Sequence, residues 1–336
     1  MRIGVDAMGG DLAPAEQVAG ALAARELLNE DDRIVLFGRQ ADIAAHLEAA
    51  GDWQDRIAVV DCPDVIGMSE SPVEALRVKQ GSSLVRMAQA HKSGEIDAMI
   101  SAGNTGACVA AAQMYLRRLQ GVHRPGIAII VPTFHGPVVL CDVGANVNCR
   151  PLHLLQYGVM AGIYVSRVAG VEVPRVGLMS IGEEDTKGNA LVRKTHELFR
   201  QRPEIRFVGN VEGRDLFRNT CEVVVCEGFV GNVCLKLMEG LAEGLFKALA
   251  GELAQAADPA LAMKAQSGLK SLLARYDYNE YGGAPLLGVN GICIICHGSS
   301  NSRAIYNAIR VSKEFATQGV NEQITTELTQ HAGMAE

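Results

Sequence analysis

The stretch DAMISAGNTGACVAAA, residues 97–112, contains the pattern on which the fold of this chain is built. A short apolar run ends at a turn of glycine, asparagine and threonine, and an alanine-rich segment with helical periodicity follows it. A buried strand, a tight turn and a helix, in that order, form the repeating unit of parallel α/β sheets. The turn has neither the G-x-G-x-x-G spacing of a dinucleotide fingerprint nor the G-x-x-x-x-G-K-[ST] spacing of a P-loop, so its glycines need another explanation.

The same unit recurs along the chain. Most of the short β-branched runs are followed by a stretch with helical periodicity, which predicts a mainly parallel sheet covered on both faces. One pair differs, because only TFHG separates IAIIVP (127–132) from PVVLCDVGAN (137–146); this spacing predicts a hairpin and makes the sheet mixed. The predicted strands are Arg2–Asp6, Arg33–Phe37, Ile57–Asp61, Asp97–Ser101, Ile127–Val131, Val138–Asp142, Val176–Ser180, Ile205–Gly209, Glu222–Cys226 and Gly291–Cys296.

The predicted architecture is a Rossmann-like three-layer αβα sandwich with a large, mainly parallel mixed sheet. No linker rich in Pro, Gly or Ser divides the chain, so we expect a single α/β catalytic unit over residues 1–336, with either one lobe or two. Residues 229–280 depart from the alternation. They predict a protruding helical pair: a long helix to about Ala250, a break near Asp258-Pro259, and an amphipathic helix ending near Tyr276.

Composition favours a folded protein of the cytoplasm. No apolar run approaches the length of a membrane span, and the N-terminal MRIGVDAMGG enters a strand pattern at once. The nine cysteines are scattered without a secretory framework, so reduced thiols are expected. The net charge of −7 gives no overall reason to expect a nucleic acid partner.

Six predicted turns share one chemical character, since each places glycine beside Asn, Thr, Ser or Lys before a helix. The carboxyl ends of parallel strands form the ligand crevice of such sheets, and free N–H groups at helix N-termini bind anions. We therefore expect these turns to converge on one rim as an anion site, although each one alone is also explained by the needs of a turn or a helix cap. They are DAMGGD (6–11), SAGNTGA (101–107), DVGAN (142–146), GEEDTKGN (182–189), GFVGN (228–232) and CHGSSNS (296–302).

Three polar residues of these turns are predicted to act in catalysis. Lys187 can bring a positive charge to a phosphate or a developing oxyanion, and the alternative is a solvated surface lysine. His297 is a candidate general acid or anion contact, or else a loop histidine with a structural role. Asn104 is the third. The predicted phosphate- or substrate-binding residues are Asp6, Gly9, Gly10, Gly103, Thr105, Gly106, Asp142, Asn146, Asn189, Asn232 and Ser299.

Carboxylates and cysteines raise two further possibilities. Asp6, Asp11 and Asp142 would suit Mg²⁺, but we favour the interpretation that they accept hydrogen bonds from turn amides, and we predict no metal. Cys293 and Cys296 match C-x-x-C, yet residues three apart in a strand face opposite sides, which favours core cysteines. Cys108 begins a helix, where the dipole lowers a thiol pKa, so a nucleophilic role stays open.

The second predicted helix of the pair carries one apolar stripe flanked by basic side chains. Such a helix packs in a core or against a dimer partner, or lies on an anionic membrane surface. The predicted membrane or carrier contacts are Lys264, Leu269, Lys270, Leu272, Leu273 and Arg275.

Seven blocks lie in order along nearly the whole chain: DAMGGDLAP (6–14), SAGNTGA (101–107), CDVGANVNCRP (141–151), IGEEDTKGN (181–189), GNVEGRD (209–215), VCEGFVGNVCLK (225–236) and YGGAPLLGVNGICIICHGSS (281–300). Together these blocks closely resemble the bacterial PlsX-type phosphate acyltransferases. The resemblance implies transfer of a long-chain fatty acyl group from acyl carrier protein to inorganic phosphate, giving acyl phosphate for a membrane acyltransferase of phospholipid synthesis. It also implies a fold related to phosphotransacetylase and isopropylmalate dehydrogenase, a homodimer, and peripheral association with the inner face of the cell membrane.

The implied chemistry agrees with the turn composition. Phosphate is already a nucleophile at neutral pH, so positioning it against the thioester and stabilising the thioester oxygen can supply much of the rate. We therefore expect direct attack, without a cofactor or an acyl-enzyme intermediate. Acyl carrier protein is acidic, which calls for a basic face near the acyl entrance. Two other classes stay open: an isopropylmalate-type NAD- and metal-dependent dehydrogenase, and a non-catalytic carrier-binding or membrane scaffold.

Overall fold

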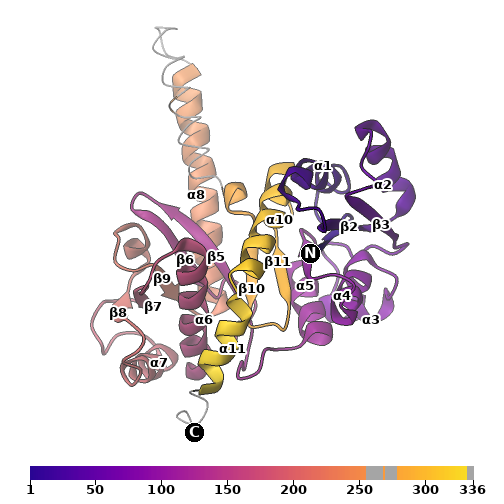
Figure 1. The fold of residues 1–336 in the computed structure, drawn as a ribbon. Coiled ribbons are helices and arrows are strands. Elements are labelled where there is room, and N and C mark those ends of the chain that lie inside the picture. Colours follow the sequence, from indigo (N-terminus) through magenta and orange to yellow (C-terminus); the bar gives the residue numbers. More distant parts are fainter. Residues whose placement is uncertain (255–267, 269–277, 331–336) are drawn as a thin grey trace.

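A single mixed sheet forms the centre of the molecule (Figure 1). The structure is a computed structural model, and it describes residues 1–254, 268 and 278–330. The described part contains eleven strands in the order β3-β2-β1-β4-β11-β10-β5-β6-β9-β7-β8. They are β1 (Arg2–Asp6), β2 (Arg33–Gly38), β3 (Ile57–Asp61), β4 (Ala98–Ser101), β5 (Gly126–Thr133), β6 (Gly136–Cys141), β7 (Val176–Met179), β8 (Phe207–Val211), β9 (Val223–Val225), β10 (Ala284–Leu287) and β11 (Ile292–Ile295).

All ten predicted strands are present, with ends shifted by a few residues at most. The predicted hairpin is confirmed, because β5 and β6 pair antiparallel from Ala128 with Cys141 to Thr133 with Gly136. Strand β10 was not predicted from the sequence; it is short, contains Pro285 and follows two glycines. Proline cannot donate to a strand ladder, and this made the segment resemble a loop.

The two halves of the sheet run in opposite directions. β10 pairs antiparallel with β11 and with β5, β5 pairs antiparallel with β6, and all the other pairings are parallel. These reversals leave β1, β4 and β11 running one way and β6, β9 and β7 the other way. The carboxyl ends of the two groups therefore point to opposite edges of the sheet, so strand direction alone does not place all six turns on one rim.

Helices cover both faces of the sheet, which confirms the three-layer αβα sandwich (Figure 1). One core lies under α1, α2, α6, α7, α10 and α11, and the other lies under α3, α4, α5 and the first turns of α8. The helices are α1 (Ala15–Ala23), α2 (Gln40–Leu47), α3 (Pro72–Val78), α4 (Ser83–Ser93), α5 (Thr105–Ala111), α6 (Pro151–Ala169), α7 (Ala190–Arg200), α8 (Gly228–Ala254), α10 (Ser302–Thr317) and α11 (Val320–Gln330), with short helical turns η1 (Ala24–Leu27), η2 (Glu48–Ala50), η3 (Ala112–Leu116), η4 (Gly213–Phe217) and η5 (Tyr278–Tyr281).

The predicted protruding element is confirmed in its first half. Helix α8 leaves the sheet after β9, crosses the face of the central strands and projects well beyond the body (Figure 1). The predicted second helix falls outside the described residues, and so do Lys264, Leu269, Lys270, Leu272, Leu273 and Arg275. None of the described helices is long and apolar enough to cross a membrane.

Candidate active site

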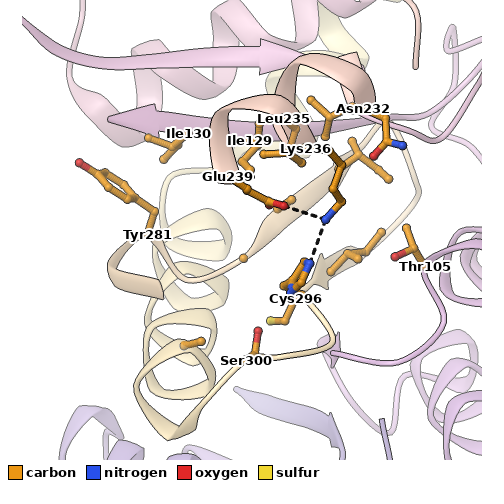
Figure 2. A pocket seen from close by; sticks show the side chains of 17 residues that line it. Thr105, Ile129, Ile130, Asn232, Leu235, Lys236, Glu239, Tyr281, Cys296 and Ser300 are labelled. Carbon is orange, nitrogen blue, oxygen red and sulfur yellow. Dashed lines mark hydrogen bonds and ion pairs between the residues drawn. The ribbon is translucent and has the colours of Figure 1, made fainter. Parts of the chain in front are cut away.

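A cavity lies between helix α8 and the central strands β5, β10 and β11 (Figure 2). Its walls differ in chemistry. Isoleucines of β5 and Leu235 of α8 form an apolar wall, whereas polar side chains of α8, of the α5 N-terminus and of the loop after β11 gather at the other side. The lining residues are Thr105, Ile127, Ile129, Ile130, Val143, Asn232, Leu235, Lys236, Glu239, Tyr281, Gly283, Ala284, Ile295, Cys296, His297, Ser300 and Ala304.

A chain of polar contacts crosses the cavity from α8 to the loop after β11 (Figure 2). Lys236 Nζ lies 2.8 Å from Glu239 Oε2 and 2.9 Å from His297 Nε2, and His297 Nδ1 lies 2.7 Å from Ser299 Oγ. An ammonium group only donates, so Lys236 in its charged form requires His297 Nε2 to accept. The backbone N–H of Ser299 also donates to His297 Nδ1 at 3.3 Å, so Ser299 holds the imidazole at its second nitrogen. This arrangement places one cation, its paired carboxylate Glu239 and one oriented imidazole on the cavity wall.

Close approach of glycines to the turn after β6 sets the position of α8. A Cβ atom on Gly231 would lie 1.9 Å from the carbonyl oxygen of Asp142, and one on Gly228 would lie 2.7 Å from the carbonyl oxygen of Asn146. Both contacts are to backbone, which cannot move aside as a flexible side chain can. The glycines of GFVGN therefore allow α8 to start directly against DVGAN, and this seating carries Asn232 and Lys236 into the cavity.

Asp142 organises that turn. It is fully buried, and its carboxylate accepts hydrogen bonds from the backbone N–H groups of Ile127, Ala145 and Asn146 at 2.8–3.0 Å. Burial raises the pKa of Asp142, and these hydrogen bonds oppose the rise. Asn146 Nδ2 in turn donates to the carbonyl oxygen of Pro125 at 2.6 Å. Both residues hold the loop in shape, as expected for turn carboxylates, and their contact with substrate stays a prediction.

Three turns meet at the carboxyl ends of β1, β4 and β11. Ser101 Oγ donates to Asp6 Oδ2 at 2.7 Å and accepts from Gly103 N at 3.1 Å, while Asp11 N donates to Gly298 O at 2.8 Å. Burial raises the pKa of Asp6, and hydrogen bonds from serine side chains and backbone amides oppose that rise. A Cβ on Gly9 would lie 2.7 Å from Gly103 N. The predicted convergence of DAMGGD, SAGNTGA and CHGSSNS is therefore confirmed.

The helix after SAGNTGA begins with a well-formed cap. Asn104 Oδ1 accepts from Ala107 N at 3.0 Å, and its Nδ2 donates to the carbonyl oxygens of Met68 and Glu70 at 3.0 Å. These contacts give Asn104 a structural role, and its catalytic role stays a prediction. Thr105 is exposed and lines the cavity. At Gly106 a Cβ would lie 2.7 Å from Pro72, so glycine allows α3 to pack closely.

GEEDTKGN lies at the other edge of the sheet, after β7, and contributes no residue to the cavity lining. Lys187 is exposed there, and Asn189 caps α7 by accepting from Val192 N at 3.0 Å. β7 is the neighbour of β9, which precedes α8, and the two strands are parallel. Lys187 therefore belongs to the same edge as Asn232, and its part in catalysis stays a prediction.

Of the predicted site residues, the structure brings Thr105, Asn232 and His297 together on the cavity wall, with Ser299 holding the imidazole. Lys236, Glu239 and Ser300 also line the cavity and were not predicted from the sequence. Lys236 stands within a helix, where no turn signal marks it. The available signal was its place at the end of VCEGFVGNVCLK, eight residues after the glycine that begins α8.

In the part of the chain that the structure describes, no group of three or more His, Cys, Asp or Glu side chains is placed to hold a metal ion. Cys108 is fully buried with its sulfur 3.7 Å from that of Cys293. The hydrogen bond with Cys293 and burial both raise the Cys108 pKa well above its usual value, which argues against a thiolate nucleophile. Cys293 and Cys296 belong to the two different cores, as their opposite facing predicts.

Sequence comparison with known proteins finds relatives of a single family. A family model described as fatty acid synthesis protein matches residues 1–323. A phosphate acyltransferase of Desulforamulus reducens is 48% identical over 339 residues, covering 100% of this chain and 100% of the relative. A phosphate acyltransferase of Pelotomaculum thermopropionicum is 47% identical, covering 98% of this chain and 95% of the relative.

Solved structures of phosphotransacetylases share the fold. One from Streptococcus pyogenes has a TM-score of 0.62 at 14% identity, with 95% of this chain and 94% of that chain covered. The EutD phosphotransacetylase from Staphylococcus aureus has a TM-score of 0.60 at 13% identity, with 94% of each chain covered. At such low identity these two structures establish the architecture only.

Proposed function

This chain belongs to the phosphate acyltransferase family, and from that premise we propose that it transfers a long-chain fatty acyl group from acyl carrier protein to inorganic phosphate. Acyl transfer to phosphate is the activity that the family supports. The nature of the acyl chain and of its carrier belongs to the proposal. So does the destination of the product, acyl phosphate for a membrane acyltransferase of phospholipid synthesis.

The observation that carries the proposal is the two-sided cavity under α8. Its apolar wall suits an aliphatic chain, because burying methylene groups is favourable by about 0.8 kcal/mol each. Its polar wall offers the ammonium of Lys236, the imidazole of His297, and the Thr105 and Ser300 hydroxyls, which suit a phosphate anion. A thioester whose acyl chain lies on the first wall would present its carbonyl to a phosphate held on the second.

The proposed reaction is a single displacement. A phosphate oxygen attacks the thioester carbonyl carbon, the carbonyl oxygen gains negative charge, and collapse of the tetrahedral intermediate breaks the carbon–sulfur bond. Lys236 stabilises the developing charge, since preorganised cations and donors contribute most in a site from which water is excluded. The carrier leaves as a thiolate whose pKa as a free thiol is roughly 8.5, so a proton from His297 assists its departure but is not required.

The assay that tests this function uses palmitoyl carrier protein with and without inorganic phosphate. Release of free carrier thiol should require phosphate, and hydroxylamine should trap the product as palmitoyl hydroxamate in equal amount. Release at the same rate without phosphate would make the protein a thioesterase and refute the proposal. Absence of release under all conditions would favour a carrier-binding scaffold.

The dehydrogenase alternative is not favoured by the comparisons, whose family relatives are phosphate acyltransferases. Asp6 and Asp142 are buried and already accept hydrogen bonds from the protein, which leaves little capacity for a metal ion. The assay for this alternative is simple. Nicotinamide absorbance that changes when this protein meets a 2-hydroxy acid substrate would revive it.

A homodimer is also part of the proposal. Large apolar side chains recur every fourth residue along α8, and each is exposed by 42–68% of its surface. Exposed apolar surface of this extent on a soluble helix marks an interaction site. We place a second copy of the chain there, and contact with the membrane and with acyl carrier protein at the residues beyond it. The exposed apolar side chains of α8 are Phe229, Val233, Leu237, Leu241, Leu245 and Leu249.

The double variant Leu237→Glu, Leu241→Glu should be a monomer in analytical ultracentrifugation if α8 forms the dimer interface. A mass unchanged from that of the wild-type dimer would remove α8 from the interface.

A further inference from the structure

A second cavity lies on the opposite face of β5, between the β5–β6 hairpin and helix α6. We name it the hairpin pocket and define it by Ile130, Pro137, Val139, Val165, Val168 and Val171. Its surface is mainly aliphatic. Glu222, at its rim, already pairs with Arg175 Nη2 at 2.5 Å, so its charge is compensated.

Ile130 connects this pocket with the candidate active site. It is the one residue that lines both cavities among those that the structure describes. In a strand, consecutive side chains point to opposite faces. Ile129 accordingly packs with the core under α8, and Ile130 packs with the core under α6. Both isoleucines are only half-buried, although β5 lies in the middle of the sheet.

The pairing of β5 explains how one side chain reaches both faces. β10 begins at Ala284 and pairs with β5 only through Leu286 and Leu287, at the amino end of β5. Beyond that point β6 continues along one side of β5, and the other side meets the short turn η5, which ends at Tyr281. The sheet is therefore interrupted beside Ile130. In Figure 2, Ile130 and Tyr281 lie at the end of the cavity opposite to Asn232 and Thr105.

We propose that the distal part of the acyl chain passes Ile130 and lies in the hairpin pocket, which makes this pocket the determinant of chain length. This inference rests on the proposed function and adds a binding site to it. Phosphate and the thioester stay at the polar wall, and the first methylene groups lie along Ile127 and Ile129. A long chain that continues in the same direction reaches Ile130 and the opening beside it. A short chain ends before that point.

The magnitude follows from methylene burial. Each methylene group transferred from water into the pocket favours binding by roughly fourfold, from about 0.8 kcal/mol. If the pocket is filled by a bulky side chain, a long acyl chain must leave its end in water, whereas an octanoyl chain loses much less. The ratio of kcat/KM for palmitoyl over octanoyl carrier protein should then fall by about tenfold or more, which equals the loss of about two buried methylene groups.

The test compares two filling variants with a control. Val168→Trp fills the hairpin pocket from α6, and Ile130→Phe narrows the passage. Glu172→Trp adds the same bulk as the first at an exposed position outside the pocket. The palmitoyl-to-octanoyl ratio should fall in both filling variants and stay at the wild-type value in the control. Ratios unchanged in both filling variants, with turnover retained, would overturn the inference while leaving the proposed function intact.

Photolabelling gives a readout that does not depend on turnover. Palmitoyl carrier protein with a diazirine at the terminal carbon should label peptides containing Val165, Val168 or Pro137. Label confined to α8 or to the strands of the first cavity would show that the chain does not pass Ile130. If the wild-type enzyme showed no phosphate-dependent turnover with either palmitoyl or octanoyl carrier protein, the proposed function would be refuted, and the inference with it.

Discussion

Replacing Lys236 with alanine tests whether its ammonium group stabilises negative charge in the candidate active site. The side chain projects from α8 into the cavity and contacts Glu239 and His297 (Figure 2). If its ammonium stabilises the charge that develops on the thioester oxygen, Lys236→Ala should lower kcat and leave the fold unchanged. The site of substitution is a helix surface position, so no core packing is lost.

The size of the effect follows from the geometry. Removal of one preorganised donor from an oxyanion site costs roughly 10²–10³ in kcat. Half of the Lys236 side chain is exposed in the free protein, at 50%, so screening by water places the expected loss near the lower end, about 100-fold. Phosphate binding should weaken as well, because the same cation attracts the anion in the ground state. Glu239→Gln, which only frees the lysine, should cost less than about tenfold.

The assay is hydroxamate trapping of acyl phosphate over a range of phosphate concentrations. Lys247→Ala serves as the matched control, since Lys247 is exposed on the same helix and lies outside the cavity. Lys236→Ala with kcat within threefold of the wild type and an unchanged melting transition would show that the Lys236 ammonium does not stabilise the developing charge. An equal loss in Lys247→Ala would show that the general charge of α8, and not this site, is what matters.

Three further predictions address the seating of α8, the pH dependence of stability and the second candidate lysine. In a urea titration, Gly231→Ala should lower the free energy of unfolding by roughly 1–3 kcal/mol, because the added Cβ lies 1.9 Å from the carbonyl oxygen of Asp142. Gly240→Ala is the control, because its Cβ meets nothing within 4 Å; it should raise the free energy of unfolding by up to about 1 kcal/mol. Burial raises the pKa of Asp32, but hydrogen bonds from Lys313 and the amino terminus outweigh it and lower the pKa to about 2. The lowered pKa corresponds to a stabilisation of roughly 2 kcal/mol, which is complete above about pH 4 and is lost as the pH falls through 2. Asp32→Asn should therefore lower the free energy of unfolding most at pH 7 and less at pH 3. A loss that grows on acidification would contradict the ion pair. Lys187→Ala should lower turnover with an intact melting transition, and wild-type kcat would remove that lysine from the site.

Much of the fold could be predicted from local patterns. Short segments such as 97–112 contain the complete pattern of a strand, a turn and a helix. The four-residue turn TFHG predicted the β5–β6 hairpin in the same way. The direction of each half of the sheet could not be predicted in the same way. It depends on β10, whose four residues include Pro285, and on which strands become neighbours after long connections. The expected convergence of six turns is therefore met only in part, since SAGNTGA, DVGAN, GFVGN and CHGSSNS contribute residues to the cavity lining and DAMGGD and GEEDTKGN contribute none.

The candidate site shows the same division. Asn232 and His297 were found because they stand beside glycines at strand ends. Lys236 was not, because a lysine on an exposed helix position normally indicates only solvent contact. Its place in the cavity depends on where α8 crosses the sheet, and the close approach of Gly231 to the carbonyl oxygen of Asp142 decides that position. A contact between residues so far apart in the chain leaves no mark in local sequence.

The most direct test of the proposed reaction centre is a crystal structure of the protein with inorganic phosphate and a non-hydrolysable acyl carrier analogue. Phosphate should lie within hydrogen-bond distance of Lys236 Nζ and His297, with the acyl chain along Ile127 and Ile129. Phosphate held instead by Lys187 and the turn after β7, with Lys236 directed away from it, would contradict the assignment of the cavity as the reaction centre.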